Sequence, residues 1–189
     1  MITILIGKSA AGKDFYQRKL IKEKGMKPII TCTTRPMRER EKEGVDYFFL
    51  SEKEFLRRTK TGEIFEYRAY NTIYNGIPSV WYYGSPKLSI ENIKTTEYVT
   101  IVDVDGALSY IKNYDKNDLN VIFIIADDVI RMDRAKKRGS FSSEEWERRV
   151  KDDEIKFGIT RINEIEKALG KKVTILDNSS LEEPFKKIQ

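Results

Sequence analysis

Four short apolar runs, widely separated along the chain, limit the folds that this sequence can adopt. Each run is almost continuously apolar, as is typical of a strand covered on both faces, because a strand with one exposed face alternates apolar and polar residues. The runs are ITILI (2–6), YVTIVDV (98–104), VIFII (121–125) and VTIL (173–176). Strands of this kind belong to parallel sheets that are sandwiched between helices.

Helical patterns fill the intervals between these runs, and PIITCTT (28–34) is a fifth strand candidate. The expected helices cover residues 14–24, 127–137, 144–169 and 181–188. This alternation predicts an α/β fold of the doubly wound kind, in which a parallel sheet is flanked by helices.

The stretch from residue 35 to residue 92 interrupts the alternation. It contains DYFFL (46–50), a helix pattern that begins at Ser51, and EIFEYRAYNTIYNGIPSVWYYGS (63–85). In the last segment, aromatic and polar residues alternate around Asn75-Gly76, which predicts a β-hairpin. A chain of 189 residues suits one domain, so we expect this stretch to form a lobe inserted into the core.

The composition excludes several kinds of catalytic site. The chain has no histidine, so a Ser-His-Asp triad and a histidine-bound zinc ion are both ruled out. Its single cysteine, Cys32, cannot form an internal disulfide, and we therefore expect a protein of the reducing cytoplasm. No apolar run approaches the roughly 20 residues that span a bilayer. The N-terminal run also lacks the basic segment and cleavage site of a signal peptide.

The charge balance is modestly basic, because 35 Lys and Arg residues oppose 30 Asp and Glu residues and give a formal net charge of +5. Opposite charges are mixed along the chain, and there is no long basic tail. We therefore favour small anionic phosphates over nucleic acid as partners, and we expect no membrane partner.

The glycine-rich segment directly after the first run carries the clearest chemical signal. Residues 7–13, GKSAAGK, fit the phosphate-loop pattern G-x-x-x-x-G-K between an expected strand and an expected helix. In that context the backbone N–H groups and the helix N-terminus point toward phosphates, while the lysine bridges them. The residues of this segment that we expect to bind ATP are Gly7, Ser9, Ala10, Ala11, Gly12, Lys13 and Asp14.

Asp14 departs from the usual pattern, in which a Ser or Thr hydroxyl follows the lysine and ligates Mg²⁺. A carboxylate is able to serve this ion directly or through water, because Mg²⁺ prefers oxygen ligands and retains much of its hydration shell. The alternative interpretation is an acidic residue in the first turn of a helix, where the helix dipole favours negative charge.

Residues 31–49, TCTTRPMREREKEGVDYFF, give the sequence a specific resemblance. They resemble the guanylate kinase family, whose pattern in this segment is T-T-R-x-x-R-x-x-E followed by G-x-D-Y-x-F. Two arginines three residues apart and a tyrosine suit one phosphate dianion, since guanidinium groups form forked, charge-assisted hydrogen bonds. The resemblance implies a P-loop NTPase-type parallel sheet, an inserted lobe that binds the nucleoside monophosphate, and a helical lid.

The same resemblance assigns the residues that bind the acceptor nucleotide. Glu66 matches the acidic residue that accepts hydrogen bonds from the guanine ring N–H and amino group, and Tyr83 matches the tyrosine at the monophosphate. The implied GMP-binding residues are Thr31, Arg35, Arg38, Glu41, Tyr47, Glu66, Tyr83, Gly84, Ser85 and Asp105. The segment between Glu66 and Tyr83 is about eight residues longer than the usual family spacing.

Two aspartates in TIVDVDG match the family's D-I-D at the end of a core strand. By this resemblance Asp103 joins Asp14 as a metal-site residue, which organises Mg²⁺ and its waters, and Asp105 faces the guanine. For Asp105, a helix cap is the alternative.

The resemblance also locates a lid over residues 139–150, followed by a long helix to residue 169. Core segments would then cover residues 1–34, 93–138 and 170–189, with Asn178 near the adenosine of ATP. The implied catalytic residues are Lys13, Arg38, Arg134, Arg138 and Arg149, with Arg148 as a neighbouring candidate. Phosphoryl transfer depends on positioning and on cations around the transferred group, so this set needs no histidine base.

The resemblance covers the chain and implies an enzyme that converts ATP and GMP or dGMP into ADP and the diphosphate with Mg²⁺, as a monomer or homodimer. One alternative is a kinase of the same fold that acts on another nucleoside or deoxynucleoside monophosphate. Another is a non-catalytic relative that binds a protein partner, although such domains have typically lost the loop lysine that is present here as Lys13. A nucleic-acid-binding module is a third alternative, and the sequence contains no recognisable motif for it.

Overall fold

The computed structural model describes residues 1–189 except 40, 75–76, 89, 138–142, 181–183 and 188–189. The chain divides into two units. Unit 1 consists of residues 1–27 and 94–189, and unit 2 consists of residues 28–93. The helix α3 (Ile90–Thr95) spans the boundary between them.

Unit 1 is built on a six-stranded sheet with the order β10-β9-β8-β1-β7-β2. Its central strands are parallel, because β1 pairs with β7 and β8 in parallel and β8 pairs with β9 in parallel. Only β10, at one edge, is recorded as antiparallel among the described pairings. The strands are β1 (Ile2–Ile6), β2 (Lys27–Pro28), β7 (Tyr98–Ile101), β8 (Leu119–Ile125), β9 (Thr174–Asp177) and β10 (Lys186–Lys187).

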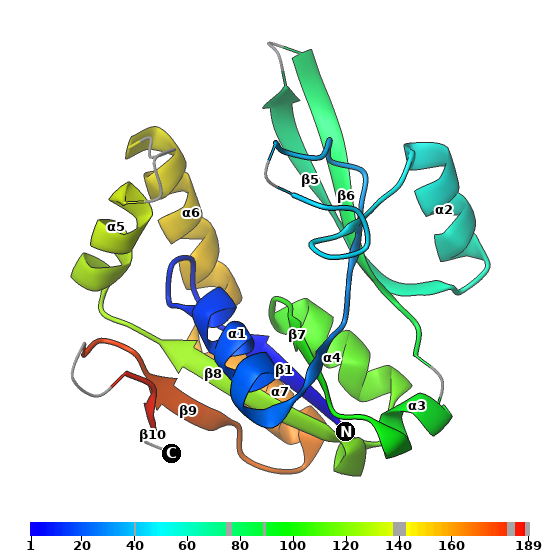
Figure 1. Ribbon diagram of the computed structural model, residues 1–189. Coiled ribbons are helices and arrows are strands. Elements are labelled where there is room, and N and C mark those ends of the chain that lie inside the picture. Colours follow the sequence, from blue (N-terminus) through cyan, green and yellow to red (C-terminus); the bar gives the residue numbers. More distant parts are fainter. Residues whose placement is uncertain (40, 75–76, 89, 138–142, 181–183, 188–189) are drawn as a thin grey trace. The chain divides into compact units, whose positions relative to one another are not determined.

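Helices cover both faces of this sheet, with α1 in front and α4 and α7 behind in the view of Figure 1. The elements are α1 (Lys13–Lys24), α4 (Val104–Asn113), the 3₁₀ turn η1 (Lys116–Asp118), α5 (Asp128–Lys136), α6 (Ser143–Lys156) and α7 (Ile159–Leu169). One buried cluster joins α1 to the sheet through Leu20, Leu5, Val99, Ile124 and Leu176. The strands are covered on both sides, which explains why their sequences are almost continuously apolar. No helix among the described residues is long and apolar enough to cross a membrane.

Unit 2 contains a four-stranded sheet with the order β4-β3-β6-β5 and one helix. Its elements are β3 (Cys32–Thr33), β4 (Phe48–Phe49), α2 (Glu52–Lys60), β5 (Ile64–Tyr74) and β6 (Ile77–Pro86). A small core of Cys32, Phe55 and Ile64 packs α2 against the sheet. Burial raises the pKa of the Cys32 thiol to about 11, so this residue is a protonated core side chain at neutral pH.

The four apolar runs are confirmed as strands, but three other expectations were wrong. Residues 28–34 do not form one strand, because Pro28 ends β2 in the six-stranded sheet and Cys32–Thr33 form β3 in the four-stranded sheet. The helix expected over 144–169 ends at Lys156 and restarts at Ile159, because Gly158 takes an extended conformation as the N-cap of α7. The described residues of 181–188 include the strand β10 in place of a helix.

The run 98–104 ends earlier than expected because Asp103 caps a helix that the sequence analysis did not identify. The Oδ1 atom of Asp103 accepts a hydrogen bond from the backbone N–H of Gly106 at 2.9 Å. Val104 therefore begins α4 rather than ending a strand, although it is apolar and buried like the strand residues before it. The hairpin prediction is confirmed by the antiparallel pairing of β5 with β6, while its turn at Asn75-Gly76 lies outside the described residues.

Candidate active site

The phosphate loop, residues 7–12, joins the end of β1 to the start of α1 in unit 1. Its backbone is left-handed at Ala10, with φ 60°, and at Gly12, with φ 106°. A Cβ atom on Gly12 would also lie 2.2 Å from Nδ2 of Asn178, so only glycine fits there. The left-handed Ala10 stores strain of a kind that clusters at ligand-binding sites.

Lys13 begins α1, and its ammonium group lies against the loop. Its Nζ donates hydrogen bonds to the carbonyl oxygens of Gly7 at 2.6 Å and Lys8 at 2.9 Å. The cation is therefore held at the N-terminus of a helix, where backbone N–H groups already favour anions. This arrangement suits the binding of a polyphosphate.

Two predicted residues from distant parts of the sequence meet at Ala11 in the same loop. Asn178, directly after β9, donates from Nδ2 to the carbonyl oxygen of Ala11 at 2.8 Å. Arg134 in α5 donates from Nη2 to the carbonyl oxygen of Asn178 at 2.8 Å and from Nη1 to that of Ala11 at 3.4 Å. Asn178, predicted to bind ATP, and Arg134, predicted to be catalytic, thus both adjoin the phosphate loop.

A buried ion pair that the sequence analysis missed supports this loop. Arg131 in α5 is 0% exposed and Asp153 in α6 is 6% exposed. Arg131 donates from Nη2 to Oδ2 of Asp153 at 2.6 Å and from Nε to the carbonyl oxygen of Ser9 at 2.8 Å. The same Oδ2 atom accepts a hydrogen bond from the backbone N–H of Ser9 at 2.8 Å. We call Arg131, Asp153 and Ser9 the Arg131 network.

The Arg131 network fixes both backbone polar groups of Ser9 and links α5, α6 and the loop. The Arg131 guanidinium also lies 5.6 Å from the ring centroid of Trp146, and Lys8 forms an ion pair with Glu154 in α6. In the sequence, Arg131 and Asp153 are two of many charged residues, and no local pattern distinguishes a buried charge from an exposed one. Only the tertiary fold shows that these two are buried together.

The two aspartates predicted for the strand end have different surroundings. Asp103 is largely buried as the cap of α4, and its Oδ2 lies 4.0 Å from Nζ of Lys156. Asp105 is exposed and forms an ion pair with Arg161 of α7. The helix cap that was an alternative for Asp105 is therefore provided by Asp103.

The remaining predicted lid and metal residues are less constrained. Arg149 lies on the exposed side of α6, and Arg148 pairs with Asp152 at 3.0 Å. Arg138 lies outside the described residues. Asp14 is exposed in the first turn of α1. Among the described residues, no group of three or more acidic or cysteine side chains is arranged to hold a metal ion by itself.

In unit 2, the predicted phosphate-binding arginine Arg35 is 4% exposed and has a fixed orientation. Its Nη2 donates to Oε1 of Glu41 at 2.6 Å, and its guanidinium lies 5.5 Å from the ring centroid of Tyr47. The hydrogen bond from Arg35 lowers the pKa of Glu41 below its usual value. Glu41 also accepts from the backbone N–H of Arg38 at 2.9 Å, so one carboxylate organises both arginines of the motif.

The predicted base-binding residues lie along the β5–β6 hairpin. Glu66 is 7% exposed, and its Oε2 accepts a hydrogen bond from the Ser85 hydroxyl at 3.0 Å. The ring of Tyr83 lies 6.0 Å from that of Tyr47, next to the Arg35 group. The next residue, Gly84, has no space for a side chain, because a Cβ atom there would lie 2.8 Å from the carbonyl oxygen of Glu66.

The predicted base-contacting residue Thr31 lies directly before β3, where its carbonyl oxygen accepts from the backbone N–H of Phe48 at 2.9 Å. Unit 2 therefore contains a buried arginine in the loop after β3, a tyrosine on β6 and a buried glutamate on β5. The first two suit a phosphate dianion, and the carboxylate suits the N–H groups of a base.

Comparisons with known proteins agree with this arrangement. A solved guanylate kinase from Anaplasma phagocytophilum is similar over 97% of this chain and 79% of its own, with a TM-score of 0.61 and 24% identity, which supports the fold. The guanylate kinase of Symbiobacterium thermophilum is 32% identical over 166 residues, covering 85% of this chain and 74% of its own length. That of Caldanaerobacter subterraneus is 34% identical over 155 residues, or 80% and 70% of the two chains. The family model described as guanylate kinase matches residues 1–189, and the chain therefore belongs to the guanylate kinase family of nucleoside monophosphate kinases.

Proposed function

We propose that this enzyme transfers the γ-phosphoryl group of ATP to GMP or dGMP and produces ADP and GDP or dGDP. The observation that carries the choice of acceptor is the buried Glu66 carboxylate, whose Oε2 is held by Ser85 in the same unit as Arg35. A carboxylate accepts hydrogen bonds only, so it suits the ring N–H and amino group of guanine and not a base that presents acceptors.

The cationic residues supply the remaining chemistry. Lys13 lies at the phosphate loop with Arg134 close by, and Arg35 is held for the acceptor phosphate. We assign Arg38, Arg138 and Arg149 to the same task of surrounding the transferred group with positive charge. Phosphoryl transfer requires little covalent work from the protein, so positioned cations account for catalysis by a chain without histidine.

Mg²⁺ would accompany ATP as the phosphoryl donor, and it supplies charge neutralisation and orientation of the phosphate oxygens. The chain offers the carboxylates of Asp14, in the first turn of α1, and Asp103, at the N-cap of α4. These are oxygen donors of the type that Mg²⁺ accepts directly or through water. Two separate carboxylates, and not a closed cage among the described residues, fit an ion that arrives bound to a nucleotide.

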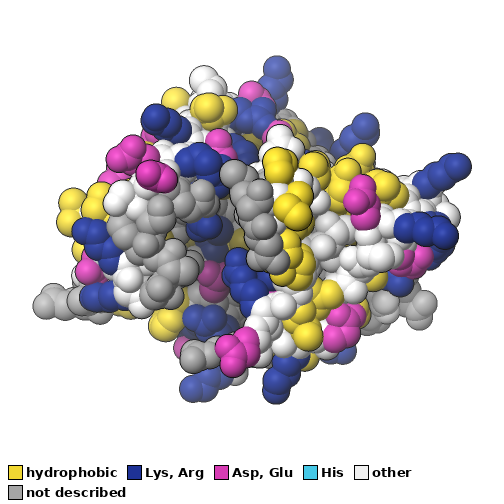
Figure 2. All heavy atoms as spheres, turned by 90° about the horizontal axis from the view of Figure 1, so that it is seen from above, with side chains coloured by type: hydrophobic (Ala, Val, Ile, Leu, Met, Phe, Trp, Pro, Cys, Tyr) yellow, Lys and Arg dark blue, Asp and Glu magenta, His cyan; other side chains and the backbone are white. Residues whose placement is uncertain are grey.

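The alternatives differ in what they require of the structure. In a kinase with another acceptor, the base-binding carboxylate would face hydrogen-bond donors of a base other than guanine. A non-catalytic relative has no need for the ordered loop and Lys13 contacts seen here. Figure 2 shows Lys and Arg side chains interspersed with Asp and Glu on the displayed face, whereas a nucleic-acid-binding surface is predominantly basic. We further expect a cytoplasmic enzyme that is a monomer or a homodimer.

The test is ADP release from ATP and Mg²⁺ in the presence of a panel of ribo- and deoxynucleoside monophosphates. The proposal predicts a response to GMP and dGMP alone. ADP release with another base in preference to guanine would show that the acceptor is a different nucleoside monophosphate. No ADP release with any member of the panel, while ATP still binds, would indicate an unusual acceptor. Failure to bind ATP would favour the non-catalytic relative.

A further inference from the structure

The β5–β6 hairpin presents three neighbouring polar or aromatic side chains on one face of β5. Glu66, Arg68 and Tyr70 are spaced two residues apart, so their side chains point to the same side of the sheet. Opposite them on β6, Ser85 pairs with Glu66 and Tyr83 pairs with Arg68. This face therefore contains the predicted base-reading carboxylate and the predicted monophosphate tyrosine, with Arg68 between them.

Arg68 is in contact with the carboxylate of Glu66. Its Nη1 lies 3.3 Å from Oε1 of Glu66, while the other carboxylate oxygen, Oε2, accepts from Ser85 at 3.0 Å. Nη1 also donates to the carbonyl oxygen of Tyr67 at 2.6 Å, which fixes the guanidinium beside the strand. The side chain of Arg68 is 28% exposed and that of Glu66 is 6% exposed, so the pair has a buried end and an accessible end.

The pair places two hydrogen-bond acceptors and a donor side by side. The Oε2 and Oε1 atoms of Glu66 are acceptors with more than one lone-pair site each, and the Arg68 guanidinium carries five N–H donors in a planar fork. Along its pairing edge, guanine presents the amino group, the N1–H group and the O6 acceptor. The order acceptor, acceptor, donor on the protein is thus complementary to donor, donor, acceptor on guanine.

We propose that Arg68 is a specificity-determining residue that donates a hydrogen bond to O6 of guanine while Glu66 accepts from the N1–H and amino groups. This inference rests on the proposed function, since it extends the base-binding role of Glu66.

The same arrangement rejects adenine. Adenine presents an amino group where guanine presents O6, so Arg68 donors would face a donor, and its N1 acceptor would face the Glu66 carboxylate. Like groups opposed in this way leave buried polar atoms unpaired, which is the strongest source of discrimination between similar ligands. Tyr70 supports the face at its outer side, where its ring lies 5.6 Å from that of Tyr83.

The test combines substitutions at Arg68 with nucleotides that keep or lack the O6 acceptor of guanine. Arg68→Met removes the charge and the donors but keeps the length of the side chain, and Arg68→Lys keeps a donor. The ligands are GMP, IMP, which lacks the amino group but keeps N1–H and O6, and 2-aminopurine riboside 5′-monophosphate, which keeps the amino group but lacks both O6 and the N1–H proton. Their Kd values are measured by calorimetry. The control is Arg57→Met, which changes the net charge equally on the exposed side of α2.

We expect Arg68→Met to raise the Kd values of GMP and IMP by about tenfold each. The Kd of the 2-aminopurine nucleotide should change by no more than about twofold. Arg68→Lys should recover part of the loss, and Arg57→Met should bind all three ligands as the unaltered protein does. An equal loss for all three ligands, unchanged binding of all three, or tighter GMP binding by Arg68→Met would each overturn the inference. If the unaltered protein does not bind GMP, the proposed function itself fails, whatever the variants show.

Discussion

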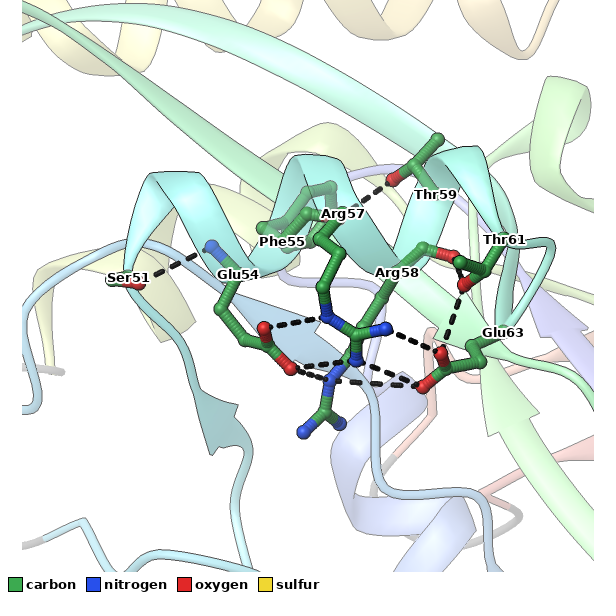
Figure 3. A network of polar contacts seen from close by, with 8 residues as sticks. All are labelled: Ser51, Glu54, Phe55, Arg57, Arg58, Thr59, Thr61 and Glu63. Atoms are coloured by element: carbon green, nitrogen blue, oxygen red, sulfur yellow. Dashed lines mark hydrogen bonds and ion pairs between the residues drawn. The ribbon is translucent and has the colours of Figure 1, made fainter.

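The molecule contains two networks of arginine and carboxylate groups in opposite environments. In unit 2, Glu54, Arg57, Arg58 and Glu63 form the α2 network along one helix and the turn after it, and Figure 3 shows the polar contacts that join these side chains. In unit 1, the Arg131 network is buried beneath the phosphate loop.

The two networks use the same chemical groups, but they differ in what their loss costs. Exposed ion pairs are screened by water and contribute roughly 0–1 kcal/mol. A buried pair is different, because removal of one partner leaves an uncompensated charge that costs about 3–5 kcal/mol. The number of ion pairs is thus a poor guide to their importance, and contact with the phosphate loop is a better one.

The largest effect should come from the loop side of this comparison, at Lys13. Lys13→Ala removes the cation that lies at the phosphate loop, and we expect kcat to fall roughly 1000-fold or more. Steady-state kinetics provide the measurement, and circular dichroism checks the fold. Normal turnover in a well-folded Lys13→Ala protein would remove Lys13 from the mechanism.

Arg131→Met should give the largest loss of stability. It leaves Asp153 buried without its partner and releases the carbonyl oxygen of Ser9, so the free energy of unfolding should fall by about 3 kcal/mol in denaturant titration. The double variant Arg131→Met/Asp153→Leu leaves no buried charge and should recover most of that loss. A single variant as stable as the parent would show that the buried pair has no special role.

Asp14 belongs to the loop by sequence but resembles the α2 network in its exposure. Asp14→Ser should therefore retain activity and change its dependence on Mg²⁺, because a hydroxyl replaces a carboxylate that serves the ion directly or through water. A titration of kcat against Mg²⁺ concentration measures the change. Complete loss of activity would mean that the site is built around the carboxylate.

The smallest effect should come from Glu54 in the α2 network. Hydrogen bonds from Arg57 and Arg58 lower the pKa of Glu54 from its usual value near 4.5 to about 2. A lowered pKa stabilises the fold above pH 4.5, and that contribution is lost as the pH falls toward 2. Glu54→Gln should lower Tm by no more than about 2 °C at pH 7.

The difference in Tm between Glu54→Gln and the parent should become smaller as the pH falls from 7 to 2.5. Calorimetric scans at pH 7, 4 and 2.5 provide the comparison, with Ser51→Ala, which removes the N-cap of α2, as a control that does not titrate. A difference that grows as the pH falls would contradict the assignment of the low pKa to Glu54.

The sequence predicted the parts of the fold that depend on local pattern. The four apolar runs became strands, and the glycine pattern with Lys13 became a loop between a strand and a helix. The helix α4 was missed because Val104 continues an apolar run, and only the cap formed by Asp103 shows that the strand has ended. The break before α7 depends on one glycine, Gly158, in an otherwise helical pattern.

The candidate site divides in the same way. Arg35, Glu41 and Glu66 followed from the resemblance to the guanylate kinase family, and the structure supplies a contact for each of them. Arg131 and Asp153 are 22 residues apart in the sequence, and their burial arises from the packing of α5 and α6 on the loop. Tertiary packing of this kind leaves no periodic signal, so the support of the phosphate loop was not predictable from sequence.

The central claim is that this chain makes GDP from GMP, and the most direct test is to detect the product. ATP, Mg²⁺ and GMP are incubated with the parent protein and with Lys13→Ala, and nucleotides are separated by ion-exchange chromatography. The account predicts that GDP and ADP appear in equal amounts with the parent and that both nearly disappear with Lys13→Ala. ADP without GDP, or no product from a folded protein that binds ATP, would contradict it.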